Sequence, residues 1–109
     1  MGRFALDFTN HLVAEEFTDA HQMLSSSLRT SLSPEDLRHE LESMIASGDG
    51  WPDSVEVVGG DDDWPAKQPP DLGWVYVSIS GDGFNEAVTV TVTVEDSKTV
   101  IRGIEWGRP

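Results

Sequence analysis

Histidine, aspartate and serine are the side chains of this sequence that could do chemistry, but their spacing matches no catalytic pattern. His11, His21 and His39 are separated by 10 and 18 residues, and no pair sits at i, i+4 with a glutamate between. A helical zinc-protease motif needs that spacing. We expect His39 to lie on the solvent-exposed face of a helix. His11 and His21 lie on or beside apolar stripes. Each is either a structural histidine with its ring hydrogen-bonded within the fold or a residue that lines a pocket.

Two short runs of polar residues also have simpler explanations. Asp61, Asp62 and Asp63 could bind a hard cation, but consecutive loop acids point apart and the D-x-D-x-D-G spacing of a calcium loop is missing. We interpret them as a solvated charge run. The run Ser25-Ser26-Ser27 lacks a G-x-S-x-G elbow, so helix capping or a loop is expected there. With no cysteine in the chain either, the sequence predicts no catalytic residue, no metal site and no cofactor.

The four tryptophans are the best functional lead. Trp51 and Trp64 precede prolines in predicted loops, where a large ring either plugs a gap in the fold or contacts a partner. With the Asp61–Asp63 run they form a candidate partner-binding loop. A second candidate site is a ligand pocket between the first helix and the sheet. Its expected lining is Phe8, His11, His21, Trp74, Tyr76 and Trp106.

The charge balance limits the partners that this chain can have. Twenty acidic residues against seven basic ones give a formal charge of −13 over 109 residues. Such a field repels phosphate backbones and anionic membranes, so we expect neither nucleic acid nor membrane as a partner. It favours a basic partner protein or a cationic ligand, although an acidic surface can also serve solubility alone. No apolar run approaches the ~20 residues of a membrane span, and we expect one cytoplasmic domain covering residues 1–109.

The first part of the chain has helical spacing. Phe4, Phe8 and Leu12 recur at i, i+4 and i+8, which predicts a first helix of about 12 to 14 residues. Polar residues that can cap a new helix follow, so we predict a break near Glu16–Thr18 and a short second helix through about Leu28.

A third helix has the clearest start in the chain. In Ser33-Pro34-Glu35-Asp36, the serine can accept hydrogen bonds from free amides, proline fits the first helical position, and two acids stand at the positive end of the helix dipole. Leu37 and Leu41 provide its buried stripe. Ser47-Gly48 is the predicted end.

A two-faced strand dominates the second half. Within Asn85–Glu95, four valines at even positions from Val88 to Val94 alternate with three threonines, so each type takes one face of a strand. The other predicted strands are Val55–Val58, Trp74–Ser80 and Thr99–Trp106, joined by turns at Gly81-Asp82-Gly83 and Asp96–Lys98 and by an exposed irregular loop Gly59–Gly73. The predicted fold is α+β, with three N-terminal helices packed on a curved antiparallel sheet of about four strands.

The order of these elements and the run FTDAHQMLSSSLRTSLSPEDLRHELESM, Phe17–Met44, resemble the nuclear transport factor 2-like superfamily and in particular its bacterial members. The resemblance implies a cystatin-like cone of helices and sheet. The superfamily includes isomerases, dehydratases, immunity proteins and binding domains, so it implies no single activity. Catalytic members similar to ketosteroid isomerase use a tyrosine inside the cone. Here the one tyrosine, Tyr76, falls on a predicted strand and does not align with it.

Two functions remain open at this point. The first is a non-catalytic interaction domain that binds a basic partner, as an immunity protein neutralises a toxin. The second is a small-molecule binder, or an isomerase- or dehydratase-like enzyme, with its ligand inside the cone. The resemblance further implies a homodimer through the outer sheet face, where Thr89, Thr91 and Thr93 are expected.

Overall fold

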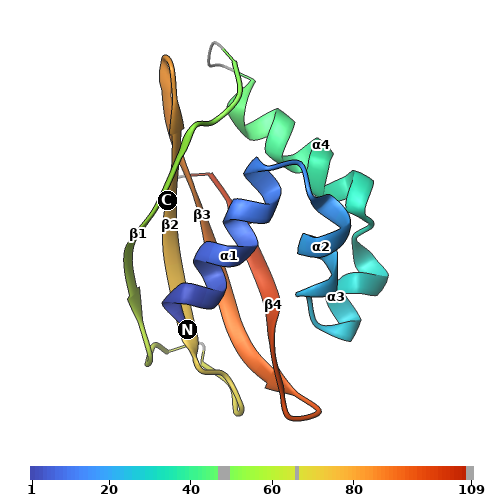
Figure 1. Cartoon of the computed structure of the whole chain (residues 1–109). Coiled ribbons are helices and arrows are strands. Elements are labelled where there is room, and N and C mark those ends of the chain that lie inside the picture. Colours follow the sequence, from blue (N-terminus) through green and yellow to red (C-terminus); the bar gives the residue numbers. More distant parts are fainter. Residues whose placement is uncertain (47–49, 66, 108–109) are drawn as a thin grey trace.

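The computed structural model describes residues 1–46, 50–65 and 67–107. A sheet forms one layer, and the helices form the second layer on one of its faces (Figure 1). The helix α1, Gly2–Val13, lies across the middle of the sheet, and α4, Pro34–Ile45, lies at the side of β3 and β4. The short helices α2, Phe17–Gln22, and α3, Ser26–Ser31, connect them. This confirms the predicted α+β class with N-terminal helices on an antiparallel sheet.

Local sequence signals account for where the helices begin and end. The helix α1 ends at Val13, and Glu15, with a φ of 62°, turns the chain just before the predicted break near Glu16–Thr18. Ser25 caps α3, since its side chain accepts a hydrogen bond from the Leu28 amide at 3.3 Å. At α4, Ser33 and Asp36 form a reciprocal capping box, with bonds of 3.1 and 2.9 Å. The capping functions predicted for these serines are confirmed.

The sheet is an antiparallel meander in the order β1-β2-β3-β4. Its strands are β1 Ser54–Asp61, β2 Gly73–Gly81, β3 Phe84–Glu95 and β4 Lys98–Trp106. Two-residue turns join the last three strands. In the second turn Asp96 and Ser97 have φ values of 51° and 65°, the left-handed geometry that suits the twist of a hairpin.

The core lies between α1 and the sheet. Phe8 and Leu12 of α1 are completely buried, as are Val88, Val90 and Val92 of β3. The strand β2 contributes Val75, Val77 and Ile79, which alternate with half-buried residues. The two-faced strand is therefore confirmed for the first three valines, while Val94 is half-buried near the end of β3.

Two predicted boundaries differ from the structure, and a third lies outside the described residues. The predicted second helix is two helices, because the chain at Leu24 forms a parallel bridge with Ile101 and leaves helical geometry there. The described residues therefore contain four helices rather than three. The strand β1 continues to Asp61, because Gly59 and Gly60 pair with β2 after a bulge at Val58. The predicted end of the third helix, Ser47-Gly48, lies outside the described residues.

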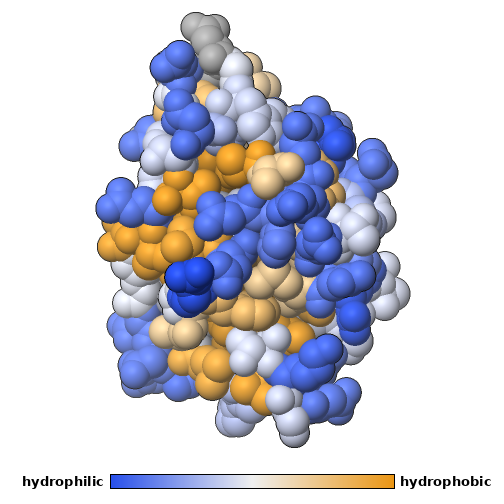
Figure 2. Space-filling view, in the orientation of Figure 1, coloured by the Kyte–Doolittle hydropathy of each residue, from blue (hydrophilic) through white to orange (hydrophobic). Residues whose placement is uncertain are grey.

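The helix-covered face is mainly polar, with an apolar patch toward β1 (Figure 2). In the part of the chain that the structure describes, Met1, Val57, Val58 and Leu72 are the large hydrophobic residues that are exposed. None of the described helices has the length and apolar character needed to cross a membrane.

Candidate functional site

The face of the sheet opposite the helices carries two rows of side chains that form the floor of a groove. One row crosses the sheet through Gly59, Tyr76, Thr89 and Glu105, which are successive partners in the strand register. The next row pairs Trp74 with Thr91. Trp74 and Tyr76 alternate with the buried residues of β2, so the pleat directs both rings away from the core.

Trp64, from the loop between β1 and β2, lines the same groove. We call this site the aromatic groove. Its volume is about 430 Å³, which lies within the ~300–1,000 Å³ typical of ligand sites. Its lining residues are Val58, Gly59, Trp64, Trp74, Tyr76, Thr89, Thr91 and Glu105.

The polar atoms of the three rings are available to a ligand. Within the described residues, the indole nitrogens of Trp64 and Trp74 and the hydroxyl of Tyr76 make no hydrogen bond to the protein. By contrast, Trp51 donates its indole N–H to the carbonyl of Val13 at 2.5 Å. Tryptophan and tyrosine combine a large apolar surface with one donor, so open donors suit them to contact a partner.

The groove carries negative charge and no described positive charge. Glu105 is exposed and lies in the floor row, and the residues lining the groove include neither lysine nor arginine. Asp62 and Asp63 are exposed and directly precede Trp64. An aromatic surface with one carboxylate is suited to a cation.

An ion pair anchors the loop that carries Trp64. Arg102 donates two hydrogen bonds to the Asp71 carboxylate, Nε to Oδ1 at 2.7 Å and Nη2 to Oδ2 at 2.6 Å. Asp71 also accepts from the Gln68 amide at 2.9 Å. Arg102 can reach the Asp71 carboxylate because it is the extra residue in a bulge of β4. At this bulge, Ile101 and Gly103 pair with successive residues of β3.

This pairing changes the acidity of the carboxyl group. The side-chain hydrogen bonds from Arg102 lower the pKa of Asp71 to about 2, against the opposing effect of burial. The pKa of Arg102 is raised by the same contact. The Asp71 side chain is 1% exposed while that of Arg102 is 32% exposed, so the carboxylate depends on its partner more than the guanidinium does.

The structure separates the residues predicted to line a pocket inside the cone. Phe8 is buried in the core, whereas Trp74 and Tyr76 lie on the opposite face of the sheet. Trp106 pairs with Val88 and packs near α4, beside Met44. The described part of the chain therefore does not bring these residues together, because core side chains fill the space between α1 and the sheet.

Among the described residues, His21 and His11 have hydrogen-bond partners. The His21 Nε2 contacts the carbonyl oxygens of Leu32 and Arg29 at 2.7 and 3.2 Å. Carbonyls only accept, so this nitrogen carries the proton and His21 ties the short helices together. The Nδ1 of His11 lies 2.9 Å from Glu16 Oε1. His39 is exposed on α4, as expected.

The residues of the predicted partner-binding loop have different positions. Trp51 packs against the core and is hydrogen-bonded there, which favours the plug interpretation for this residue. Trp64 lines the groove, which favours the contact interpretation. Asp61 ends β1, and Asp61–Asp63 are exposed.

The aromatic groove differs from the predicted interior pocket, although the sequence contains a signal for it. The alternation of Val75 and Val77 with Trp74 and Tyr76 assigns both rings to the outer face once the valines are assigned to the core. The positions of Val58, Thr91 and Glu105 depend on strand register, which the sequence did not define. The pair Asp71–Arg102 is a contact between residues 31 apart, and no local pattern indicates it.

Comparisons of this chain with protein-family models, with curated proteins and with solved structures found no match.

Proposed function

We propose that this chain is a non-catalytic interaction domain that binds a basic protein, and that the aromatic groove receives a lysine or arginine side chain of that partner. The supporting observation is the composition of the groove. Two indoles, a phenol and the Glu105 carboxylate line it without a basic residue. The face of an aromatic ring attracts a cation, tryptophan most strongly, and such a contact contributes about 2 kcal/mol when it is desolvated.

The charge of the whole chain supports the same partner class. A formal charge of −13 steers a basic protein toward the surface and accelerates association. Asp62 and Asp63, which are exposed and directly precede Trp64, add to this field. A toxin or enzyme with a basic surface, neutralised as an immunity protein would neutralise it, is the partner that we propose.

We further propose that the chain has the cystatin-like cone fold, and we consider how it would assemble. Helices on one face of a curved antiparallel sheet are compatible with the cystatin-like cone that the sequence resembles. A homodimer through the outer sheet face would cover Trp74 and Tyr76. The two uses of this surface therefore exclude each other, and we assign the surface to the basic partner.

Calorimetric titration with a blocked arginine-rich peptide tests the proposal, at about 0.15 M ionic strength, where long-range attraction is screened. A citrulline peptide of the same length is the uncharged control. We expect the arginine peptide to bind and the citrulline peptide to fail. Trp64→Ala should weaken binding at least tenfold, because it removes a wall of the groove without changing the charge.

A matched pair of charge variants separates the groove from the general field. Glu105→Gln and Glu42→Gln each remove one negative charge, but Glu42 is exposed on α4, remote from the groove. Glu105→Gln should weaken binding more. Equal effects of the two variants, or an unchanged affinity in Trp64→Ala, would show that the peptide binds the acidic surface without using the groove.

A small organic cation is a second candidate for the same site. The groove volume of about 430 Å³ favours it, since this is enough for a ligand of modest size. Titration with arginine methyl ester distinguishes the two. Binding as tight as that of the peptide would favour the small molecule, whereas much weaker binding favours a protein partner.

A further inference from the structure

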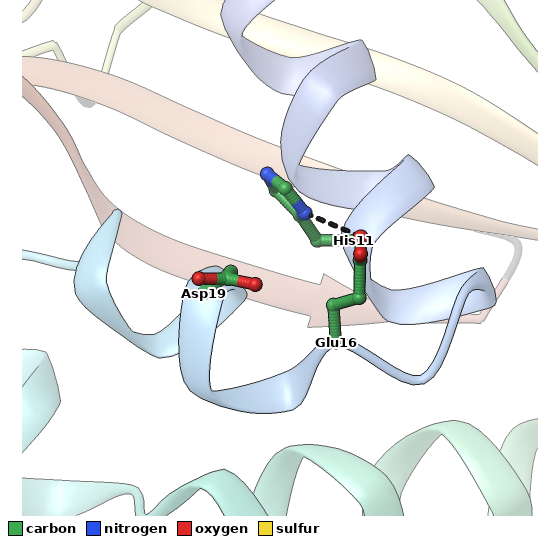
Figure 3. A group of neighbouring side chains, drawn as sticks. All are labelled: His11, Glu16 and Asp19. Atoms are coloured by element: carbon green, nitrogen blue, oxygen red, sulfur yellow. Dashed lines mark hydrogen bonds and ion pairs between the residues drawn. The ribbon is translucent and has the colours of Figure 1, made fainter.

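A second cluster of side chains, remote in sequence from the groove residues, lies where α1 meets α2. His11 is in the last turn of α1, Glu16 is the N-cap of α2, and Asp19 is in the first turn of α2. One ligand atom from each residue lies within 4.8 Å of the other two. Figure 3 shows His11 and Glu16 pointing toward one another, with Asp19 beside them on α2.

The backbone holds two of these residues close together. The left-handed conformation of Glu15 reverses the chain after α1. The amide of Glu16 then donates to the carbonyl of His11 at 2.8 Å. The imidazole and the Glu16 carboxylate are thus brought face to face, with Nδ1 2.9 Å from Oε1.

Among the described residues, no lysine or arginine side chain pairs with the carboxylates of this cluster. The Asp19 carboxylate has no hydrogen bond or ion pair there. Arg38 pairs with the neighbouring Glu15 at 3.3 Å and lies 4.7 Å above the ring of Phe17. Two carboxylates and an imidazole therefore face one another without a lysine or arginine side chain among the described residues.

We propose that His11, Glu16 and Asp19 form a binding site for a divalent transition-metal ion, with Zn²⁺ as the preferred ion. One imidazole nitrogen and two carboxylate oxygens are ligands that zinc accepts, and three protein ligands leave a fourth position for water. The ion takes the place of the proton between Nδ1 and Oε1. Small rotations bring the ligands to about 2 Å from the ion, since all three side chains are at the surface.

The ion would link the end of α1 to the start of α2. This junction contains the left-handed Glu15, and the amide of Glu16 donates a hydrogen bond to the carbonyl of His11 across it. A ligand that binds only the folded chain raises its stability. Zinc should therefore raise the melting temperature.

Titration of the tag-free, chelator-treated protein with zinc chloride at about 0.15 M ionic strength tests the proposal. We expect one saturable site and an increase in melting temperature. His11→Ala, Glu16→Gln and Asp19→Asn should each weaken binding at least tenfold and abolish the increase. Circular dichroism without zinc shows whether each variant folds.

Two controls address the other places where an acidic protein could hold zinc. His39→Ala removes an exposed histidine on α4, and Asp62→Asn removes a charge from the acidic run. Both variants should bind zinc as the unmodified chain does. No saturable binding, binding retained in His11→Ala, or an equal loss in His39→Ala would overturn the proposal.

Discussion

Removing one member of the Asp71–Arg102 pair should have unequal effects, depending on which member is removed. In Arg102→Leu, the Asp71 carboxylate keeps its buried position and loses the two guanidinium hydrogen bonds. In Asp71→Asn, the guanidinium is left with a neutral partner, and its 32% exposure allows water to solvate it. We expect Arg102→Leu to be the more destabilising variant.

The magnitudes follow from the acidity of the pair. A pKa lowered from 3.8 to about 2 corresponds to about 2 kcal/mol of stability at neutral pH, at about 1.4 kcal/mol per unit. Asp71→Asn should lose about this amount. Arg102→Leu should lose about 3 kcal/mol, the lower end of the range for a buried charge left without its partner.

The pH dependence has a definite sign. Because folding lowers the pKa of Asp71, its contribution is complete above pH 3.8 and is lost as the pH falls toward 2. The difference between the unmodified chain and Asp71→Asn should therefore be constant from pH 5 to 7 and shrink below pH 4. Arg102→Leu should recover relative stability on acidification, since burial raises the pKa of the unpaired carboxyl group.

Urea unfolding followed by tryptophan fluorescence and circular dichroism measures these differences. Arg3→Ala is the control, because the Arg3–Asp7 pair is exposed, and such pairs contribute less than about 1 kcal/mol. Equal losses in Asp71→Asn and Arg102→Leu, or a loss that does not change with pH, would show that the buried Asp71 carboxylate does not depend on Arg102 for its stability. Because the pair anchors the loop of Trp64, both variants should also weaken binding of the arginine peptide.

Four further outcomes are expected. Leu12→Ala should lower the free energy of unfolding by about 2 to 5 kcal/mol in urea titrations, because Leu12 is completely buried. A loss below 1 kcal/mol would contradict the core that we describe. Ser33→Ala should cost about 1 kcal/mol, measured in the same way, through loss of the capping box; an unchanged midpoint would exclude that contribution. Ser97→Gly should raise stability by about 0.5 kcal/mol, since Ser97 has a φ of 65°, and a clear decrease in melting temperature would argue against that turn. Light scattering at high micromolar concentration should find a monomer, because a dimer on the outer sheet face would close the groove.

Much of the fold could be predicted because its determinants are local. The four residues Ser33-Pro34-Glu35-Asp36 contain a complete signal for the start of a helix. The alternation of valine and threonine in β3 has a period of two, which by itself indicates a strand. The split between α2 and α3 could not be predicted. It depends on Leu24 bridging to Ile101, which is a contact between distant parts of the chain.

The candidate sites could not be predicted from the sequence, because they also depend on contacts between distant parts of the chain. The groove combines Trp64 from a loop with residues of all four strands, so its composition follows from register and from the position of that loop. The cluster of His11, Glu16 and Asp19 depends on the left-handed Glu15. A search for paired histidines could not find it, because its other ligands are carboxylates.

Binding of a basic partner in the aromatic groove can be followed through the indole N–H resonances of the four tryptophans in an NMR titration with the blocked arginine peptide. We predict that the resonances of Trp64 and Trp74 shift with the same dissociation constant while that of Trp51, hydrogen-bonded to Val13, stays in place. If saturating peptide leaves the resonances of Trp64 and Trp74 unchanged, or shifts that of Trp51 as strongly, the groove is not the binding site.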